Sequence, residues 1–219
     1  MSIASLPTLL IATRNDHKVG EIRAILGEDF RYLTLKDFPN APAVVEDADT
    51  FAGNASKKAN ELAQWLGRMP NAECRMPNFI LADDSGLEVD ALNGAPGVHS
   101  ARFAALDKSE NSKDADNNAK LLRLLQDVPQ EKRTARFCCV IALATTTPHS
   151  TLRTPHLCDG TCEGRIEFAP RGQGGFGYDP LFVPDGFTQS FAELGEATKN
   201  QLSHRAKALV KLRATLIDL

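Results

Sequence analysis

The sequence predicts a mixed α/β fold, with strands and helices interleaved along one chain of 219 residues. Short continuous apolar runs, such as residues 8–12 and 79–82, are typical of buried strands. Longer segments between such runs repeat apolar residues three and four positions apart, as one face of a helix does. The length suffices for one substantial core or for two lobes around a cleft.

The strands are predicted from apolar runs and β-branched residues, and their alternation with helices is an α/β pattern that leaves the direction of individual strands open. In chain order they are residues 8–12, 79–82, 87–92, 136–144, 164–168 and 181–183.

Four helices are predicted between and after these strands. The first carries apolar residues from position 19 to 26 and ends at Gly27. The second runs from about Thr50 to the residue before Gly67, and the third contains the leucines at 121, 122, 124 and 125. The last begins near Ser203, a favourable N-cap residue. Residues 68–77 and 145–160 are rich in polar residues and proline, which predicts solvent-facing, dispensable loops.

The composition is typical of a globular protein and argues against two classes, nucleic-acid binders and membrane proteins. Hydrophobic residues make up 42% and charged residues 24%, as in ordinary globular proteins. A net charge of −3 argues against a non-specific nucleic-acid binder. Residues 1–7 lack the basic start of a signal peptide, and no apolar run approaches membrane-spanning length. We therefore expect a cytoplasmic protein with neither a nucleic-acid nor a membrane partner.

The five cysteines are an odd number without a secretory signal, which favours reduced thiols. Cys138 and Cys139 lie in an apolar run that predicts a buried strand. His156, Cys158 and Cys162 lack a second ligand pair at zinc-site spacing, so a structural zinc is disfavoured.

The most informative stretch is Asp83, Asp84, Ser85 and Gly86, directly after an apolar run. Adjacent carboxylates and a hydroxyl where a chain leaves a sheet are hard oxygen ligands, suited to Mg²⁺ beside a phosphate. The same residue types also form ordinary turns.

A glycine-rich segment at residues 172–177 matches G-x-G-x-x-G. A dinucleotide fingerprint needs a helix to open on its last glycine, and here another strand follows. Two interpretations remain: a loop that approaches a ligand, with Phe176 stacking on a base, and a flexible hairpin connection.

Two groups of polar and basic residues open helices. Thr13, Asn15 and Lys18 precede and enter the first helix, where backbone N–H groups favour anions. Lys199 and residues 203–205 lie at the start of the last helix. Taken alone, the first group is better explained by an N-cap and a solvated lysine. For the second group, a solvated helix start is an equally good explanation.

Together these segments resemble one family, the noncanonical purine nucleoside triphosphate pyrophosphatases that act on inosine and xanthosine triphosphates. The resemblance extends from about Leu9 to Leu216. It is carried by TxNxxKxxE over residues 13–21, LADDSGL over residues 81–87, NGAPG over residues 93–97 with SAR over residues 100–102, GFGYDP over residues 175–180 and SHR over residues 203–205.

The resemblance implies an elongated mixed sheet with two lobes flanking an active-site cleft, formed by a single domain over residues 1–219. It also implies a homodimer and a Mg²⁺-dependent hydrolysis of ITP, dITP or XTP to the monophosphate and pyrophosphate. Mg²⁺ and converging lysines would neutralise charge that develops on the triphosphate.

The roles implied by the resemblance start with Asp84 as general base and metal ligand, with Glu46 as the second metal ligand and Asp83 as an adjacent candidate. Phosphate or ribose contacts are implied for Thr13, Asn15, Lys18, Lys58 and Ser85. Contacts to the base, or to its pocket, are implied for Phe176, Gly177, Tyr178, Asp179, Lys199, His204 and Arg205. Donors aimed at a 6-oxo group would be left unpaired by adenine, which would explain selectivity.

The chain departs from the family pattern in two places. Gly53 stands where family members usually carry Glu, and residues 195–198 are less acidic than usual. Two alternatives are a phosphohydrolase for another nucleotide, such as a modified pyrimidine, and a non-enzymatic nucleotide-binding or scaffold protein. The second would be expected to lack Asp84 or Lys18, and both are present.

Overall fold

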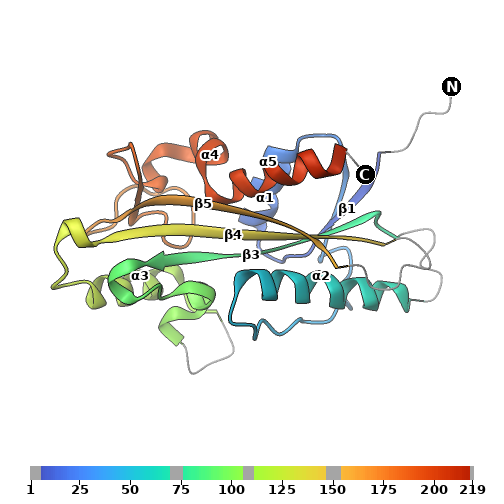
Figure 1. The fold of residues 1–219 in the computed structure, drawn as a ribbon, viewed down its shortest axis with the longest axis horizontal. Helices are drawn as coiled ribbons and strands as arrows, with labels where there is room; N and C mark the ends of the chain where they lie inside the picture. Colours follow the sequence, from blue (N-terminus) through green and yellow to red (C-terminus); the bar gives the residue numbers. More distant parts are fainter. Residues whose placement is uncertain (1–5, 70–75, 106–110, 147–153, 218–219) are drawn as a thin grey trace. The chain divides into compact units, whose positions relative to one another are not determined.

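The computed structural model describes residues 6–69, 76–105, 111–146 and 154–217. In chain order its strands and longer helices are β1 Thr8–Ile11, α1 Asp16–Leu26, β2 Arg31–Thr34, α2 Phe51–Gly67, β3 Phe79–Val89, α3 Asp114–Leu124, β4 Thr134–Thr145, β5 His156–Ile166, β6 Phe182–Pro184, α4 Phe191–Leu202 and α5 His204–Ile217 (Figure 1).

The strands form one six-stranded sheet in the order β2-β1-β3-β4-β5-β6. β1 is parallel to β2 and β3, whereas β5 and β6 are antiparallel, so the predicted mixed α/β fold is confirmed. Contacts divide the chain into two compact units: unit 1 contains residues 1–84, 140–159 and 208–219, and unit 2 contains residues 85–139 and 160–207. The single domain over residues 1–219 stays a prediction.

Unit 1 has its core on the apolar face of α2. Ala55, Ala59 and Leu62 of this helix are fully buried against alternate residues of the neighbouring strands, Leu10 and Ile80 among them. Figure 1 shows α1 and the C-terminal part of α5 on the opposite side of these strands. The strands of unit 1 are therefore buried on both faces, which explains their continuous apolar sequence.

Unit 2 has an aromatic core. The rings of Phe137 and Phe182 lie 4.7 Å apart in an edge-on arrangement, and Phe191 at the start of α4 packs 5.2 Å from Phe182. Leu121 of α3 is fully buried in the same cluster. Figure 1 shows α3 and α4 on opposite sides of β4 in this unit.

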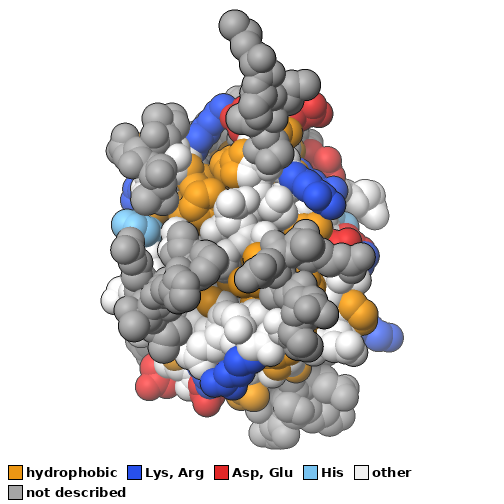
Figure 2. Space-filling model, turned by 90° about the vertical axis from the view of Figure 1, so that its right-hand side faces the viewer, with side chains coloured by type: hydrophobic (Ala, Val, Ile, Leu, Met, Phe, Trp, Pro, Cys, Tyr) orange, Lys and Arg blue, Asp and Glu red, His pale blue; other side chains and the backbone are white. Residues whose placement is uncertain are grey.

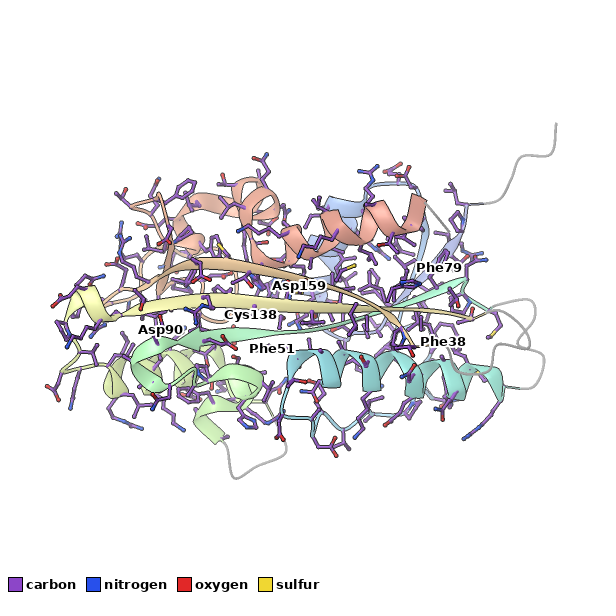
Figure 3. The ribbon with its side chains drawn as sticks, in the orientation of Figure 1. Phe38, Phe51, Phe79, Asp90, Cys138 and Asp159 are labelled. Carbon is purple, nitrogen blue, oxygen red and sulfur yellow. The ribbon has the colours of Figure 1, made fainter. Side chains whose placement is uncertain are left out.

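A charged group runs across the strands of unit 2. Arg136 of β4 lies 2.9 Å from Asp90, just beyond β3, and 3.1 Å from Glu163 of β5. Figure 3 labels Asp90 and, two residues along from Arg136, Cys138. Burial raises the pKa of the Cys138 thiol to about 12 and keeps it protonated. The four described cysteines are free thiols, and Cys74 lies outside the described residues.

Figure 2 shows basic and acidic side chains of the described residues on the same face, with hydrophobic side chains between them. Within the described ranges, no helix is long and apolar enough to cross a membrane.

The four predicted helices are confirmed, with Thr50 as the N-cap of α2, Gly27 after α1 and the hydroxyl of Ser203 accepting from the N–H of Ala206. The predicted strand end at residue 82 is wrong. β3 continues for 11 residues through Asp83 and Asp84, because its backbone stays paired in the sheet with β4.

Two further boundaries differ from the sequence prediction. The segment 87–92 is not a separate strand, since β3 ends at Val89 and residues Asp90–Leu92 form a 3₁₀ turn. β5 begins at His156, inside the predicted loop of residues 145–160, and gains its strand structure from pairing in the sheet. The short strand β2 and helix α4 were not predicted.

Candidate active site

The first part of the candidate site is the turn between β1 and α1. The parallel register places Ile11 opposite Leu81, and the N–H of Ala12 donates to the carbonyl of Leu81 at 2.8 Å. The turn therefore runs beside Asp83, two residues further along β3. Asn15 caps α1, because its side-chain oxygen accepts from the N–H of Lys18 at 3.2 Å and from that of His17 at 2.9 Å.

Lys18 then reaches from the first turn of α1 to β3. Its ammonium group lies 2.6 Å from Oδ1 of Asp83, and the two side chains are only 17% and 2% exposed. The interpretation of Lys18 as a solvated residue is wrong. The lysine is held in place by a buried carboxylate.

Helix α2 supplies a second lysine and an amide to the same strand. Lys58 donates to the backbone carbonyl of Asp83 at 2.9 Å and lies 2.8 Å from Oε1 of Glu46. Burial alone would lower the pKa of Lys58, but the charges of Glu46, Asp83 and Asp84 raise it above its ordinary value. One helical turn earlier, Asn54 donates to Oδ2 of Asp84 at 3.0 Å.

Asp84 is a buried carboxylate whose pKa is raised. It is 5% exposed, and burial raises its pKa from 3.8 to about 6. Lys58 and Lys18 oppose this shift, whereas the negative charge of Glu46 adds to it. A carboxylate that titrates near neutral pH between two cations is suited to accept a proton from water.

Unit 2 holds a second polar group around Asp179. Oδ2 of this buried carboxylate accepts from the ammonium group of Lys199 at 2.6 Å and from the N–H of Phe176 at 2.8 Å. The same ammonium group lies 4.3 Å from the centre of the Phe176 ring, within range of a cation–π interaction. Asp179 thus holds the backbone of Phe176 and the ammonium group of Lys199.

The glycine-rich segment makes this arrangement possible. Gly175 has φ of +72°, and a Cβ there would collide with Oδ2 of Asp179. Gly177 has φ of +63°, and its N–H and carbonyl bond to the side chains of Asp114 and Asn118. The segment lies in the connection between the antiparallel strands β5 and β6, and hydrogen bonds from the N–H groups of Phe176 and Gly177 hold it in place.

The start of α5 adds two more buried side chains. His204 stacks on Phe137, with ring centres 4.8 Å apart, and Arg205 donates to the hydroxyl of Ser85 at 2.8 Å. Both are almost fully buried, at 4% and 1% exposure. The solvated-helix interpretation of this segment is wrong. Tyr178 is buried as well, and its hydroxyl donates to the carbonyl of Ser100 at 2.9 Å.

Comparison with known proteins identifies the family. The sequence model of the Ham1 family matches residues 9–215. The chain belongs to the Ham1 family. It is 48% identical over 204 residues to the dITP/XTP pyrophosphatase of Desulforamulus reducens, with 93% of this chain and 92% of that protein covered. It is also 48% identical over 205 residues to the dITP/XTP pyrophosphatase of Geobacillus kaustophilus, covering 93% and 91%.

Solved structures of the Ham1 family agree with the fold. A HAM1 protein from Coxiella burnetii aligns with a TM-score of 0.78 at 34% identity, covering 97% of this chain and all of that one. The Ham1 protein of Staphylococcus aureus gives the same TM-score at 33% identity, covering 96% and 98%. The resemblance inferred from the sequence motifs is thereby confirmed.

The structure groups most of the predicted site residues within each unit. In unit 1 it brings together the side chains of Lys18, Glu46, Lys58, Asp83 and Asp84. In unit 2 it links Ser85 to Arg205 and Phe176 to Asp179 and Lys199.

Some residues predicted to contact the nucleotide make hydrogen bonds within the protein. The side-chain oxygen of Asn15 caps a helix, the hydroxyl of Thr13 accepts from the N–H of Asn15, and the hydroxyl of Tyr178 bonds within unit 2. Sequence reasoning missed Asn54. Its position one helical turn before Lys58 was the signal that could have found it.

The donor set of unit 1 fits a divalent cation. Within the described part of the chain, no three His, Cys, Asp or Glu side chains gather as a complete metal site. Glu46 nevertheless raises the pKa of Asp84, which shows two carboxylates repelling one another. A small divalent ion relieves such repulsion, and Mg²⁺ is often held by one or two carboxylates plus substrate phosphates.

Proposed function

We propose that the protein hydrolyses noncanonical purine nucleoside triphosphates, namely ITP, dITP and XTP, to the monophosphate and pyrophosphate. The observation that carries the proposal is the state of Asp84. Burial raises the pKa of this carboxylate to about 6, although the charges of Lys18 and Lys58 oppose the rise. Its place in a Ham1-family chain, whose relatives include named dITP/XTP pyrophosphatases, supports this substrate class.

The unit 1 residues would perform the chemical step. Asp84 orients a water molecule and accepts its proton as the water attacks the phosphoanhydride. Lys18 and Lys58 stabilise negative charge that develops on the phosphate oxygens. A Mg²⁺ ion held by Asp84 and Glu46 would supply further positive charge to the phosphates.

Phosphate binding would also involve the neighbouring turn. Thr13 and Asn15 lie at the N-terminus of α1, where backbone N–H groups and the helix dipole favour an anion. Asn15 already caps the helix with its oxygen, so its amide N–H₂ group is the part suited to a phosphate or ribose oxygen.

The unit 2 residues would recognise the base. Phe176 is half-buried and held at its backbone by Asp179, which suits it to stack on a purine. Lys199, His204 and Arg205 are the donors we assign to the purine edge or an adjacent phosphate. A 6-oxo group accepts such hydrogen bonds, whereas the 6-amino group of adenine leaves them unpaired.

The resemblance to the family also supports two finer inferences. We infer that the enzyme is a homodimer and that it works in the cytoplasm. Light scattering coupled to gel filtration tests the first inference, and a mass corresponding to one chain would contradict it.

The test of function is a comparison of kcat/KM for ITP, dITP, XTP, ATP, GTP and dUTP with Mg²⁺ present. We expect pyrophosphate and monophosphate in equal amounts, and a higher kcat/KM for the three noncanonical purines. Stepwise release of orthophosphate would identify another kind of phosphohydrolase. Preference for dUTP would identify a pyrimidine substrate, and the absence of turnover of every nucleotide would favour a binding protein.

A further inference from the structure

We propose that Asn54 is a positioning residue for Asp84, and that it ties this carboxylate to the segment that carries Glu46. The inference rests on the proposed function, because it assigns Asn54 a part in the same reaction. Asn54 belongs to the first turn of α2, three residues after Phe51, which Figure 3 labels at the start of the helix. It is fully buried.

Asn54 uses both halves of its amide. Its Nδ2 donates to Oδ2 of Asp84 at 3.0 Å, and its Oδ1 accepts from the backbone N–H of Ala48 at 2.9 Å. Ala48 lies two residues after Glu46. One side chain therefore bridges the proposed base and the segment of the proposed second metal ligand.

The chemistry of the two partners selects an amide. A backbone N–H can only donate, and an ionised carboxylate can only accept, so the bridging group must offer one acceptor and one donor. Aspartate lacks the donor, and leucine of similar size lacks both. The two partners also fix which end of the amide is oxygen.

The helix makes the bridge rigid. Thr50 caps α2 by accepting from the N–H of Gly53 at 3.0 Å. Asn54 and Lys58 are four residues apart and so share a helix face. Lys58 contacts the Asp83 carbonyl and Glu46, so the two residues hold the same strand and the same segment from one helix.

Loss of the donor should act on the chemical step. A buried carboxylate without this hydrogen bond can rotate away from the geometry in which it accepts a proton from water. The hydrogen bond joins Asn54 to the carboxylate and does not involve the nucleotide. We therefore expect a lower kcat with a KM that changes little.

The experiment compares Asn54→Asp with Asn117→Asp. Asn117 is a matched control in unit 2: it is 3% exposed, accepts from the N–H of Ala104 and donates to the backbone carbonyl of Ala101. Both substitutions keep the acceptor, remove the donor and add a buried charge. Asn54→Asp alone loses a bond to the proposed base and also sets a second carboxylate against it, an effect that the Ala variants of the two residues avoid.

We expect Asn54→Asp to lower kcat for dITP about 10- to 100-fold relative to Asn117→Asp, the effect of one lost hydrogen bond to a charged group. KM should stay within about threefold. Binding of a non-hydrolysable dITP analogue, followed by calorimetry, should be retained, and both variants should show similar losses in melting temperature. If the Asp variants do not fold, Asn54→Ala and Asn117→Ala make the same comparison.

Equal kcat values for the two variants would overturn the positioning role. A loss that lies wholly in KM or in analogue binding would do the same. The proposed function is tested separately by the wild-type enzyme, whose products are independent of the ratio between variants.

Discussion

The candidate site residues of unit 1 and those of unit 2 differ in their balance of charge. In unit 1, Glu46, Asp83 and Asp84 are set against two lysines, so carboxylates are in excess. In unit 2, Asp179 is set against Lys199, and the guanidinium of Arg205 adds a second positive charge. An excess of carboxylate suits a divalent cation, whereas an excess of buried donors suits the oxygen atoms of a purine edge.

The difference also shows in what each group does to its central carboxylate. Asp84 is raised in pKa, so burial outweighs its two lysines. Asp179 instead receives an ammonium group at 2.6 Å and a backbone N–H at 2.8 Å on one oxygen. The first carboxylate is prepared to exchange a proton, while the second holds neighbouring groups in place.

The strongest test of this comparison is Asp84→Asn. The amide keeps the shape of the side chain but does not accept a proton, so we expect kcat to fall about 10²- to 10⁴-fold. Analogue binding should survive. A kcat within about tenfold of wild type would remove Asp84 from the role of base.

The same substitution has a predicted effect on stability without metal. Asp84 has a folded pKa of about 6 and an ordinary pKa of 3.8, so the folded protein binds more protons between these values. Wild-type stability therefore falls as pH rises through this window. At pH 8, Asp84→Asn should unfold with a free energy higher by on the order of 2 kcal/mol. Denaturant melts in EDTA at pH 8 and pH 4 test this, and the advantage should be smaller at pH 4.

The next largest effect is expected for Lys18→Ala. A cation near the phosphates serves both bound substrate and transition state, so KM should rise and kcat should fall. We expect kcat/KM to drop about 10- to 100-fold. Product monophosphate should inhibit the variant and the wild type more nearly alike.

Lys57 of α2 provides the control for Lys18. Lys57 pairs with exposed Asp47 at 2.5 Å and should tolerate replacement by Ala with activity unchanged. If Lys18→Ala and Lys57→Ala behave alike, the lysine of α1 has no part in the reaction.

Sequence reasoning identified the elements whose signal is local. Thr50 and Gly27 are residue types that predict the start of α2 and the end of α1. The apolar stripe of α2 predicts its buried face. It failed where pairing with distant strands decides the outcome. Asp83 and Asp84 look like a turn in sequence, yet β4 keeps their backbone in a sheet.

The site was predicted mainly through the motifs, which named side chains but not their partners. Lys18 pairs with Asp83, which lies 65 residues further along the chain. Asp179 accepts from the N–H of Phe176, only three residues before it, but the motif alone does not show this bond. Asn54 was missed because its importance lies in a contact with a residue 30 positions away. Its place one helical turn before Lys58 indicates a shared helix face but not the residue that it bonds.

A smaller effect on kcat/KM is expected for Arg205→Ala in unit 2. If Arg205 donates to the 6-oxo group, Arg205→Ala should lower kcat/KM for ITP more than for ATP. The discrimination should shrink by about 1–3 kcal/mol, the value of a hydrogen bond to a buried polar group. Ser85→Ala, which removes one hydrogen-bond partner of this guanidinium, tests whether that bond places the side chain. Equal proportional losses on both nucleotides would mean that Arg205 contacts phosphate or supports the structure.

The smallest effect, and the finest test of unit 1, concerns Gly53. A Cβ at Gly53 would lie 2.7 Å from Cβ of Ala48 and 3.0 Å from Oγ1 of Thr50. Gly53→Ala should therefore displace Ala48, whose N–H bonds to Asn54. Gly20 lies in helix α1, where an added Cβ meets nothing within 4 Å, so Gly20→Ala is the matched control.

Replacing glycine by alanine inside a helix stabilises it by about 0.5–1 kcal/mol. Gly20→Ala should show this gain with activity unchanged, whereas Gly53→Ala should show no gain and a kcat lower by roughly threefold, a partial form of the loss expected from a broken hydrogen bond. Because the contact is between two Cβ atoms, the double variant Ala48→Gly with Gly53→Ala should recover kcat. Failure of that recovery would mean that the space beside Ala48 does not control the placement of Asp84, and the link through Asn54 would lose its support.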